Sequence, residues 1–202
     1  MKKAGMLIAL IVAMAVTLCG CGSKSESNSE KGEDTSGMLT GKHNVEIDIK
    51  DYGIIKVELD ADAAPISVTN FIKLAKEGFY EGSTFHRIMY GFMMQGGDTP
   101  AGKTPAENIK GEFAMNGVEN NLSHTRGAIS MARADDMNSA SSQFFIVHQD
   151  ATYLDGAYAA FGYVTEGMDV VDKVCGDSRP IDNNGTILPE EQPVINSIKV
   201  ID

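Results

Sequence analysis

The chain has 202 residues, of which 43% are hydrophobic, 22% are charged and none is Trp. This composition excludes a collagen, a coiled coil and a fully disordered chain, and the length suits one domain of ordinary size. With 17 basic and 28 acidic residues the formal net charge is −11, which makes the chain a poor candidate for electrostatic binding to nucleic acid or anionic lipid.

The first twenty residues predict a secretion signal. Lys2 and Lys3 precede an apolar run over 6–18, which is too short to span a bilayer, since a span needs about 20 residues. The run ends in Leu18-Cys19-Gly20-Cys21, which resembles the lipobox of bacterial lipoproteins. The resemblance implies that 1–20 are removed, that Cys21 is acylated, and that the chain is anchored to the cell membrane on its extracytoplasmic face. The alternative is an ordinary secretory signal with two incidental cysteines.

Residues 21–40 are expected to form a flexible tether. They are rich in Ser, Glu, Lys and Gly and contain almost no apolar side chain, so burial cannot offset the entropy of ordering them. Loss of 1–20 would remove two lysines and no acid, which leaves 15 − 28 = −13 for the mature chain. An anionic membrane surface would repel that charge, so the lipid on Cys21 would have to provide the attachment.

Alternating apolar residues and turn signals predict a domain over 41–202 made mostly of strands. A helix is expected to start at Pro65 and to end at Gly78, and a second helix is expected over 168–174. Strands are expected at 45–49, 54–59, 85–90, 92–95, 128–132, 143–147, 160–164 and 194–201. Two helices among eight strands are too few for parallel βαβ units, so the pattern favours an antiparallel barrel or sandwich.

Three segments carry a family resemblance. They are Phe85-His86-Arg87-Ile88-Met89-Tyr90-Gly91-Phe92-Met93-Met94-Gln95-Gly96-Gly97-Asp98, then 127–134 with 138–146, and finally 153–156 with 160–164 and 166–168. Together they resemble the cyclophilins, a family of peptidyl-prolyl cis-trans isomerases, over about residues 43–202. The resemblance implies an all-β-dominated fold, a closed eight-stranded antiparallel barrel capped by two α-helices. It also implies isomerase activity on X-Pro bonds with no cofactor and no metal.

The family also implies the site. Arg87 would be the donor to the proline nitrogen, and Phe92 and Gln95 would complete the catalytic set. Strand alternation predicts that Arg87 shares one face with Phe85 and Met89, with His86 on the other. The expected substrate-binding residues are Met93, Ala132, Arg133, Gln143, Phe145, Tyr153, Leu154 and Tyr158.

The expected substrate-binding residues divide by role. Phe92, Met93, Phe145 and Leu154 would form the proline pocket. Gln95 and Gln143 would bind the peptide backbone or orient Arg87. Ala132 and Arg133 would line a strand edge that pairs with the peptide. Tyr153 and Tyr158 stand where many family members carry Trp and His.

The sequence does not support a nucleotide site or a metal site. Residues 97–104 match the phosphate-loop pattern, but Pro105 follows at once and leaves little room for the required helix, so no nucleotide is expected. No zinc-like spacing relates His43, His86, His124 and His148, and Cys175 is expected to be a small buried side chain.

The sequence therefore predicts a monomeric, membrane-anchored isomerase acting on proline-containing secreted or unfolded polypeptides, without nucleic acid. The alternative function is a non-catalytic scaffold of the same fold that binds proline peptides.

Overall fold

The computed structural model describes residues 37–202. The predicted signal and the acylated Cys21 lie outside the described residues, as does most of the predicted tether. Residues 37–40 belong to the end of that tether, and here the backbone N–H of Leu39 donates to Thr69 Oγ1 at 2.9 Å. Within 37–202 no helix has both the length and the apolar character needed to cross a membrane.

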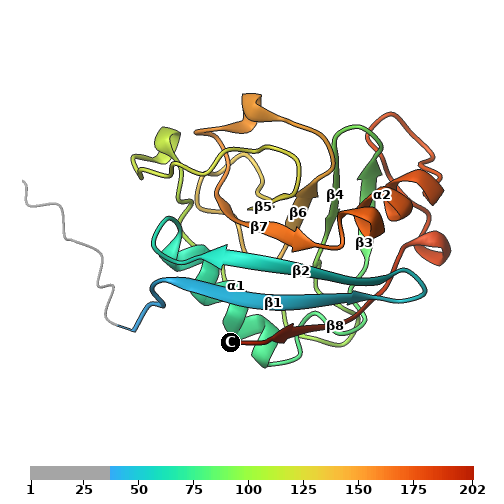
Figure 1. Cartoon of the computed structure of the whole chain (residues 1–202), viewed down its shortest axis with the longest axis horizontal. Coiled ribbons are helices and arrows are strands. Elements are labelled where there is room, and N and C mark those ends of the chain that lie inside the picture. Colours follow the sequence, from blue (N-terminus) through green and yellow to red (C-terminus); the bar gives the residue numbers. More distant parts are fainter. Residues whose placement is uncertain (1–36) are drawn as a thin grey trace, which may run out of the picture. The chain divides into compact units, whose positions relative to one another are not determined.

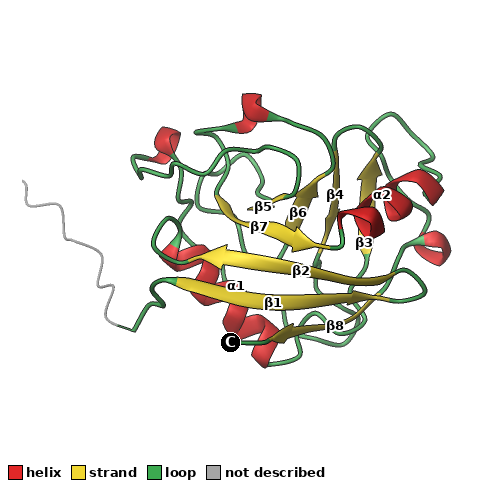
Figure 2. Ribbon diagram, in the orientation of Figure 1, coloured by secondary structure: helices red, strands yellow, loops and turns green. Residues whose placement is uncertain are grey.

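Eight antiparallel strands form one curved sheet, with two α-helices packed against it (Figures 1 and 2). The strands are β1 (Lys42–Ile49), β2 (Gly53–Asp60), β3 (Phe85–Met89), β4 (Met93–Gly96), β5 (Ala128–Met131), β6 (Phe144–Val147), β7 (Ala160–Glu166) and β8 (Ile195–Val200). The helices are α1 (Pro65–Lys76) and α2 (Met168–Asp177). The strand order is β3-β4-β6-β5-β7-β2-β1-β8, so every element expected from the sequence is present.

The sheet does not close into a barrel, and this part of the prediction is wrong. β3 and β8 are the two edges, and they meet at one end, through an isolated bridge between Thr84 and Val194 and a hydrogen bond from Gly82 N–H to Ile195 O at 2.9 Å. The outer edge of β3 is instead occupied by a loop, because Ile88 N–H donates to Gly185 O at 2.8 Å and Ile187 N–H donates to His86 O at 3.0 Å. With that edge taken, β8 cannot pair along β3, and the sheet remains a curled half-barrel.

The local sequence explains the elements well. Val45, Ile47 and Ile49 alternate with polar residues in β1 and are buried, and the same alternation recurs in β2. In α1 the apolar spacing puts Val68 and Phe71 in the core, and Phe71 packs edge-on against Phe144 of β6 at 5.3 Å.

Both ends of α1 are held by identifiable contacts. At its C-terminus Gly78 has φ +66°, and the N–H groups of Gly78 and Phe79 donate to the carbonyls of Ala75 and Leu74, which is a Schellman motif. At its N-terminus the buried carboxylate of Glu112 accepts hydrogen bonds from the helix. The second helix, α2, continues past its expected end and includes Gly176.

Candidate active site

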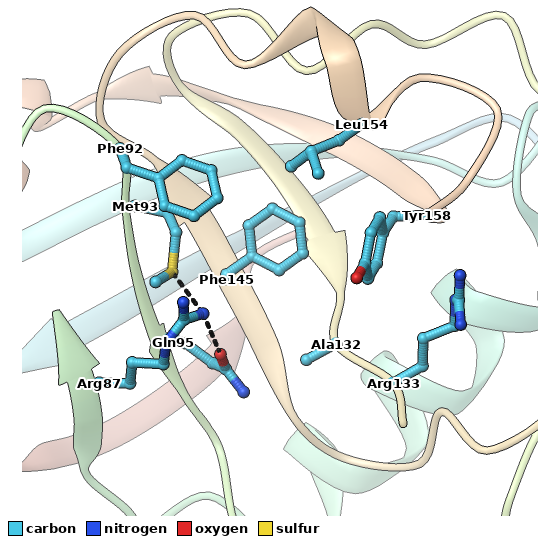
Figure 3. A pocket seen from close by; sticks show the side chains of 9 residues that line it. All are labelled: Arg87, Phe92, Met93, Gln95, Ala132, Arg133, Phe145, Leu154 and Tyr158. Carbon is cyan, nitrogen blue, oxygen red and sulfur yellow. Dashed lines mark hydrogen bonds between the residues drawn. The ribbon is translucent and has the colours of Figure 1, made fainter. Parts of the chain in front are cut away.

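A pocket of about 270 Å³ opens on the face formed by β3, β4 and β6 and the segments that follow β5 and β6 (Figure 3). Its lining contains nine of the eleven residues predicted for the site: Arg87, Phe92, Met93, Gln95, Ala132, Arg133, Phe145, Leu154 and Tyr158. The other two lie beside it. Gln143 lines an adjoining hollow, and Tyr153 is 72% exposed with its ring centroid 6.0 Å from that of Phe92.

Arg87 is presented to the pocket by a distortion of β3. The register against β4 shifts between Phe85 and Arg87, so that Phe85 and Ile88 both enter the core, while Arg87 lines the pocket and Met89 packs against the pocket's apolar cluster. The prediction that Phe85 shares a face with Arg87 is therefore wrong, because strict alternation fails at the shift. His86 does face away from the pocket and lines a separate hollow.

Four contacts fix the guanidinium of Arg87. Its Nε donates to the backbone oxygen of Asn184 at 2.7 Å, and its Nη1 donates to Gln95 Oε1 at 3.2 Å. The sulfur atoms of Met89 and Met93 lie 3.3 Å from Nη2 and 4.0 Å from Nη1. Among residues 37–202, no carboxylate lies within ion-pair distance of Arg87. The positive charge is thus held in place but not neutralised.

Gln95 links Arg87 to the neighbouring strand. While its Oε1 accepts from Arg87, its Nε2 donates to Gln143 Oε1 at 2.9 Å. This arrangement defines the orientation of both amides, since each oxygen faces a donor. Gln143 therefore acts on the pocket through Gln95.

Aromatic and aliphatic side chains form the rest of the pocket. Met93 and Phe145 are almost fully buried, and Phe92, Leu154 and Tyr158 pack against them. The ring of Tyr158 meets that of Phe145 edge-on at 6.0 Å. Figure 3 shows these side chains surrounding a space next to the Arg87 guanidinium. The site thus combines an apolar recess with the Arg87 guanidinium.

A buried histidine that the sequence analysis did not assign to the site supports the pocket floor. The ring of His124 stacks under Phe145 at 5.9 Å, its Nδ1 lies 2.7 Å from Asp155 Oδ1, and its Nε2 lies 2.9 Å from Ser130 Oγ. Burial lowers the pKa of His124, which Asp155 partly opposes. The order Ser-His-Asp matches a hydrolase triad, but Ser130 and His124 have no exposed surface and cannot reach a substrate.

Arg133 lies at the rim between the pocket and the adjoining hollow. Its guanidinium carbon is 4.8 Å from the Tyr158 ring centroid and 5.1 Å from that of Phe113. The preceding residue, Ala132, follows the interior strand β5, and its N–H donates to Gln143 O at 2.9 Å. The sequence predicts that Ala132 and Arg133 line a strand edge that pairs with the peptide. The N–H of Ala132 is not free for such pairing, because it already donates to Gln143 O.

The phosphate-loop match and Cys175 have structural roles. Lys103 donates to the backbone oxygens of Gly78, Phe79 and Glu81 beyond the end of α1, and residues 105–110 form no helix. The lysine therefore has no geometry for holding a phosphate. Cys175 is buried in α2, and burial raises the pKa of its thiol to about 12, as expected for an unreactive side chain.

Known proteins share this sequence and architecture. The family model described as cyclophilin type peptidyl-prolyl cis-trans isomerase/CLD matches residues 44–200. The chain is 41% identical to peptidyl-prolyl cis-trans isomerase A of Dickeya dadantii over 157 residues, which cover 74% of this chain and 80% of that protein. It is 38% identical to peptidyl-prolyl cis-trans isomerase B of Escherichia coli over 160 residues, covering 74% and 94%.

A solved structure agrees. The crystal structure of a Cryptosporidium parvum cyclophilin type peptidyl-prolyl cis-trans isomerase, in the presence of the dipeptide Ala-Pro, superposes with a TM-score of 0.67 and 28% identity. The match covers 79% of this chain and 99% of that one. The chain belongs to the cyclophilin-type peptidyl-prolyl cis-trans isomerases.

Proposed function

We propose that Arg87 supplies the chemistry of this isomerase by stabilising the twisted X-Pro amide. Rotation about a peptide bond costs about 18–20 kcal/mol because it breaks the amide resonance. In the twisted state the proline nitrogen regains a lone pair, and a fixed cationic donor beside it lowers the barrier. The observation that supports this role is the immobilised, carboxylate-free guanidinium of Arg87 at the edge of an apolar recess.

The recess itself would hold the pyrrolidine ring. Phe92, Met93, Phe145 and Leu154 provide apolar walls, and Gln95, with Gln143 behind it, keeps Arg87 turned toward the ring. The Ala-Pro dipeptide present with the Cryptosporidium relative supports a proline-sized ligand. Ala132, Arg133, Tyr153 and Tyr158 would contact the residues on either side of the proline. No step in this scheme requires a cofactor or a metal.

The loop that accepts the Nε–H of Arg87 gives a first test of this scheme. Gly185 lies in that loop with φ +87°, and a Cβ atom there would lie 2.5 Å from Met89 Cγ and 2.7 Å from Ile88 O. Gly185→Ala should therefore push the loop and Asn184 away from β3. We expect kcat/KM for a proline peptide to fall about 10- to 100-fold, as for a misplaced catalytic group.

Gly176→Ala is the matched control for this substitution. A Cβ at position 176 in α2 meets no atom within 4 Å, so this change should leave kcat/KM intact. Full activity in a folded Gly185→Ala protein would mean that the loop does not position Arg87.

We further propose that the isomerase is a lipoprotein held outside the cytoplasm, where it assists secreted chains whose X-Pro bonds isomerise slowly. The support is the sequence Leu18-Cys19-Gly20-Cys21 after a short apolar run, followed by a polar stretch long enough to hold a domain off the membrane. The names of the relatives favour this enzyme over a non-catalytic scaffold.

Fatty-acid labelling in a bacterial host tests the anchor. We expect the full chain to take up labelled palmitate and to fractionate with the membrane, and Cys21→Ala to abolish both. Cys19→Ala is the matched control, since Leu18 before Cys19 does not fit the lipobox, and it should keep the label. Loss of label in Cys19→Ala with retention in Cys21→Ala would mean that Cys19 is the acylated residue. No label in the wild-type chain would mean that the protein is not a lipoprotein.

A further inference from the structure

The turn between β3 and β4 carries Phe92 into the pocket, and the N–H of Gly91 in this turn is not bonded within the turn. Phe92 N–H donates to Met89 O at 2.9 Å, and Gly91 at the third position has φ +82°, which is the pattern of a type II turn. In such a turn the N–H of the third residue points outward, so the Gly91 N–H needs an acceptor from elsewhere.

His148, directly after β6, provides that acceptor. Its Nδ1 lies 2.9 Å from the Gly91 nitrogen, and its own backbone N–H donates to Phe92 O at 2.8 Å. The side chain is buried, with the Tyr90 ring covering it at a centroid distance of 4.8 Å. His148 therefore binds the backbone on both sides of the Gly91–Phe92 peptide bond, at the N–H of Gly91 and at the C=O of Phe92.

The tautomer of His148 follows from its second contact. Its Nε2 lies 3.2 Å from Asp172 Oδ1 on α2, and a carboxylate can only accept, so Nε2 carries the proton and Nδ1 is free to accept from Gly91. Arg126 holds Asp172 through two hydrogen bonds of 2.8 Å and donates to the His148 carbonyl at 2.6 Å. Asp150 in turn accepts from the Arg126 amide at 2.7 Å.

We propose that His148 is a positioning residue of this isomerase, whose Nδ1 fixes the β3–β4 turn and thereby holds Phe92 in the proline pocket. The proposal rests on the role assigned above to Phe92 in binding the proline ring. His148 itself lies outside the lining of the pocket. It acts only through Gly91 and Phe92, and it adds no chemistry to the rotation.

Protonation would reverse this contact. A second proton on His148 would sit on Nδ1 and face the Gly91 N–H, so two donors would oppose each other and the turn would be released. Burial lowers the pKa of His148, Asp172 opposes that shift and Arg126 adds to it. The neutral ring therefore predominates at pH 7, and the acid loss of activity should lie below the ordinary histidine value of about 6.5.

Two substitutions separate the contacts of His148. In His148→Asn the Oδ1 atom takes the place of Nδ1 and can accept from Gly91, whereas in His148→Gln the polar group reaches toward Asp172 and leaves Gly91 without an acceptor. With the full chain in mild detergent and an uncoupled proline-peptide assay, we expect His148→Gln to lower kcat/KM about three- to tenfold at pH 7.5, mainly through KM. His148→Asn should recover most of that loss and show no acid limb between pH 5 and 7.

The Gly91 amide resonance gives a readout that does not depend on turnover. In the wild-type chain it should titrate together with the His148 ring, and in His148→Asn it should not titrate. His43→Asn, at a histidine paired with Asp202 and remote from the turn, is the matched control. It should leave unchanged both the pH dependence of kcat/KM and the titration of the Gly91 amide resonance. Equal activity in the Gln and Asn variants, or a Gly91 resonance that ignores the His148 titration, overturns the proposal. If the Gly91 resonance titrates with His148 but the wild-type chain does not isomerise the peptide, the result would count against the proposed catalytic role of the pocket and not against the role of His148.

Discussion

Replacing Arg87 with Ala is expected to lower kcat/KM for X-Pro isomerisation by about 100- to 1,000-fold, the usual effect of removing one preorganised donor. No other cation in the described residues is placed to substitute for it, because Arg133, which also lines the pocket, has its guanidinium between the Phe113 and Tyr158 rings and bonded to Ala157 O. The remaining acceleration would come from the pocket, which still holds the proline ring away from water. The measurement is an uncoupled assay on a proline tetrapeptide.

The same substitution should leave the fold intact. Arg87 is only partly buried and makes no ion pair, so its loss leaves no buried charge without a partner. The thermal unfolding curve should stay close to that of the wild type. Arg87→Lys keeps the charge but cannot bond Asn184 and Gln95 together, so it should recover little activity. Arg179→Ala, at a surface arginine that bonds only nearby backbone carbonyls, should be fully active. A folded and fully active Arg87→Ala protein would remove the mechanism.

The sequence predicts those parts of the fold that depend on local periodicity. Alternation in β1 and β2 and the helical spacing of Val68 and Phe71 each require only a few neighbouring residues, so the elements appear where expected. The pocket was predictable for a different reason, since its residues fall in long family motifs. Neither source gives the register shift after Phe85, which places that ring in the core instead of beside Arg87.

The remaining features depend on residues that are distant in sequence. Asn184 accepts from Arg87 through its backbone oxygen and lies 97 positions away in the sequence, so no side-chain pattern predicts this contact. The same loop occupies the outer edge of β3 and keeps the sheet from closing. The local residue that permits this close approach is Gly185, because its positive φ beside a strand favours glycine.

Replacing Glu112 with Ala is expected to have the largest effect on stability, lowering the free energy of unfolding by about 3–5 kcal/mol. Glu112 is 1% exposed, and its Oε1 and Oε2 accept from the N–H groups of Ile66 and Ser67 at 2.8 Å each. Oε2 also accepts from Ser67 Oγ at 2.6 Å. The N-cap residue of α1, Ala64, has no side chain to take over, so three donors would lose their acceptor, two of them on the buried Ser67.

Urea denaturation of the variants measures this effect. Glu112→Gln keeps one acceptor oxygen but turns an amide NH₂ toward donors and loses the negative charge at the helix N-terminus, so its stability should lie between those of Glu112→Ala and the wild type. Glu107→Ala removes an exposed glutamate from the same loop and should change the stability by less than about 0.5 kcal/mol. If Glu112→Ala and Glu107→Ala unfold at the same urea concentration, then the packing of its buried face is enough to hold α1 on the sheet, and its N-terminus needs no carboxylate.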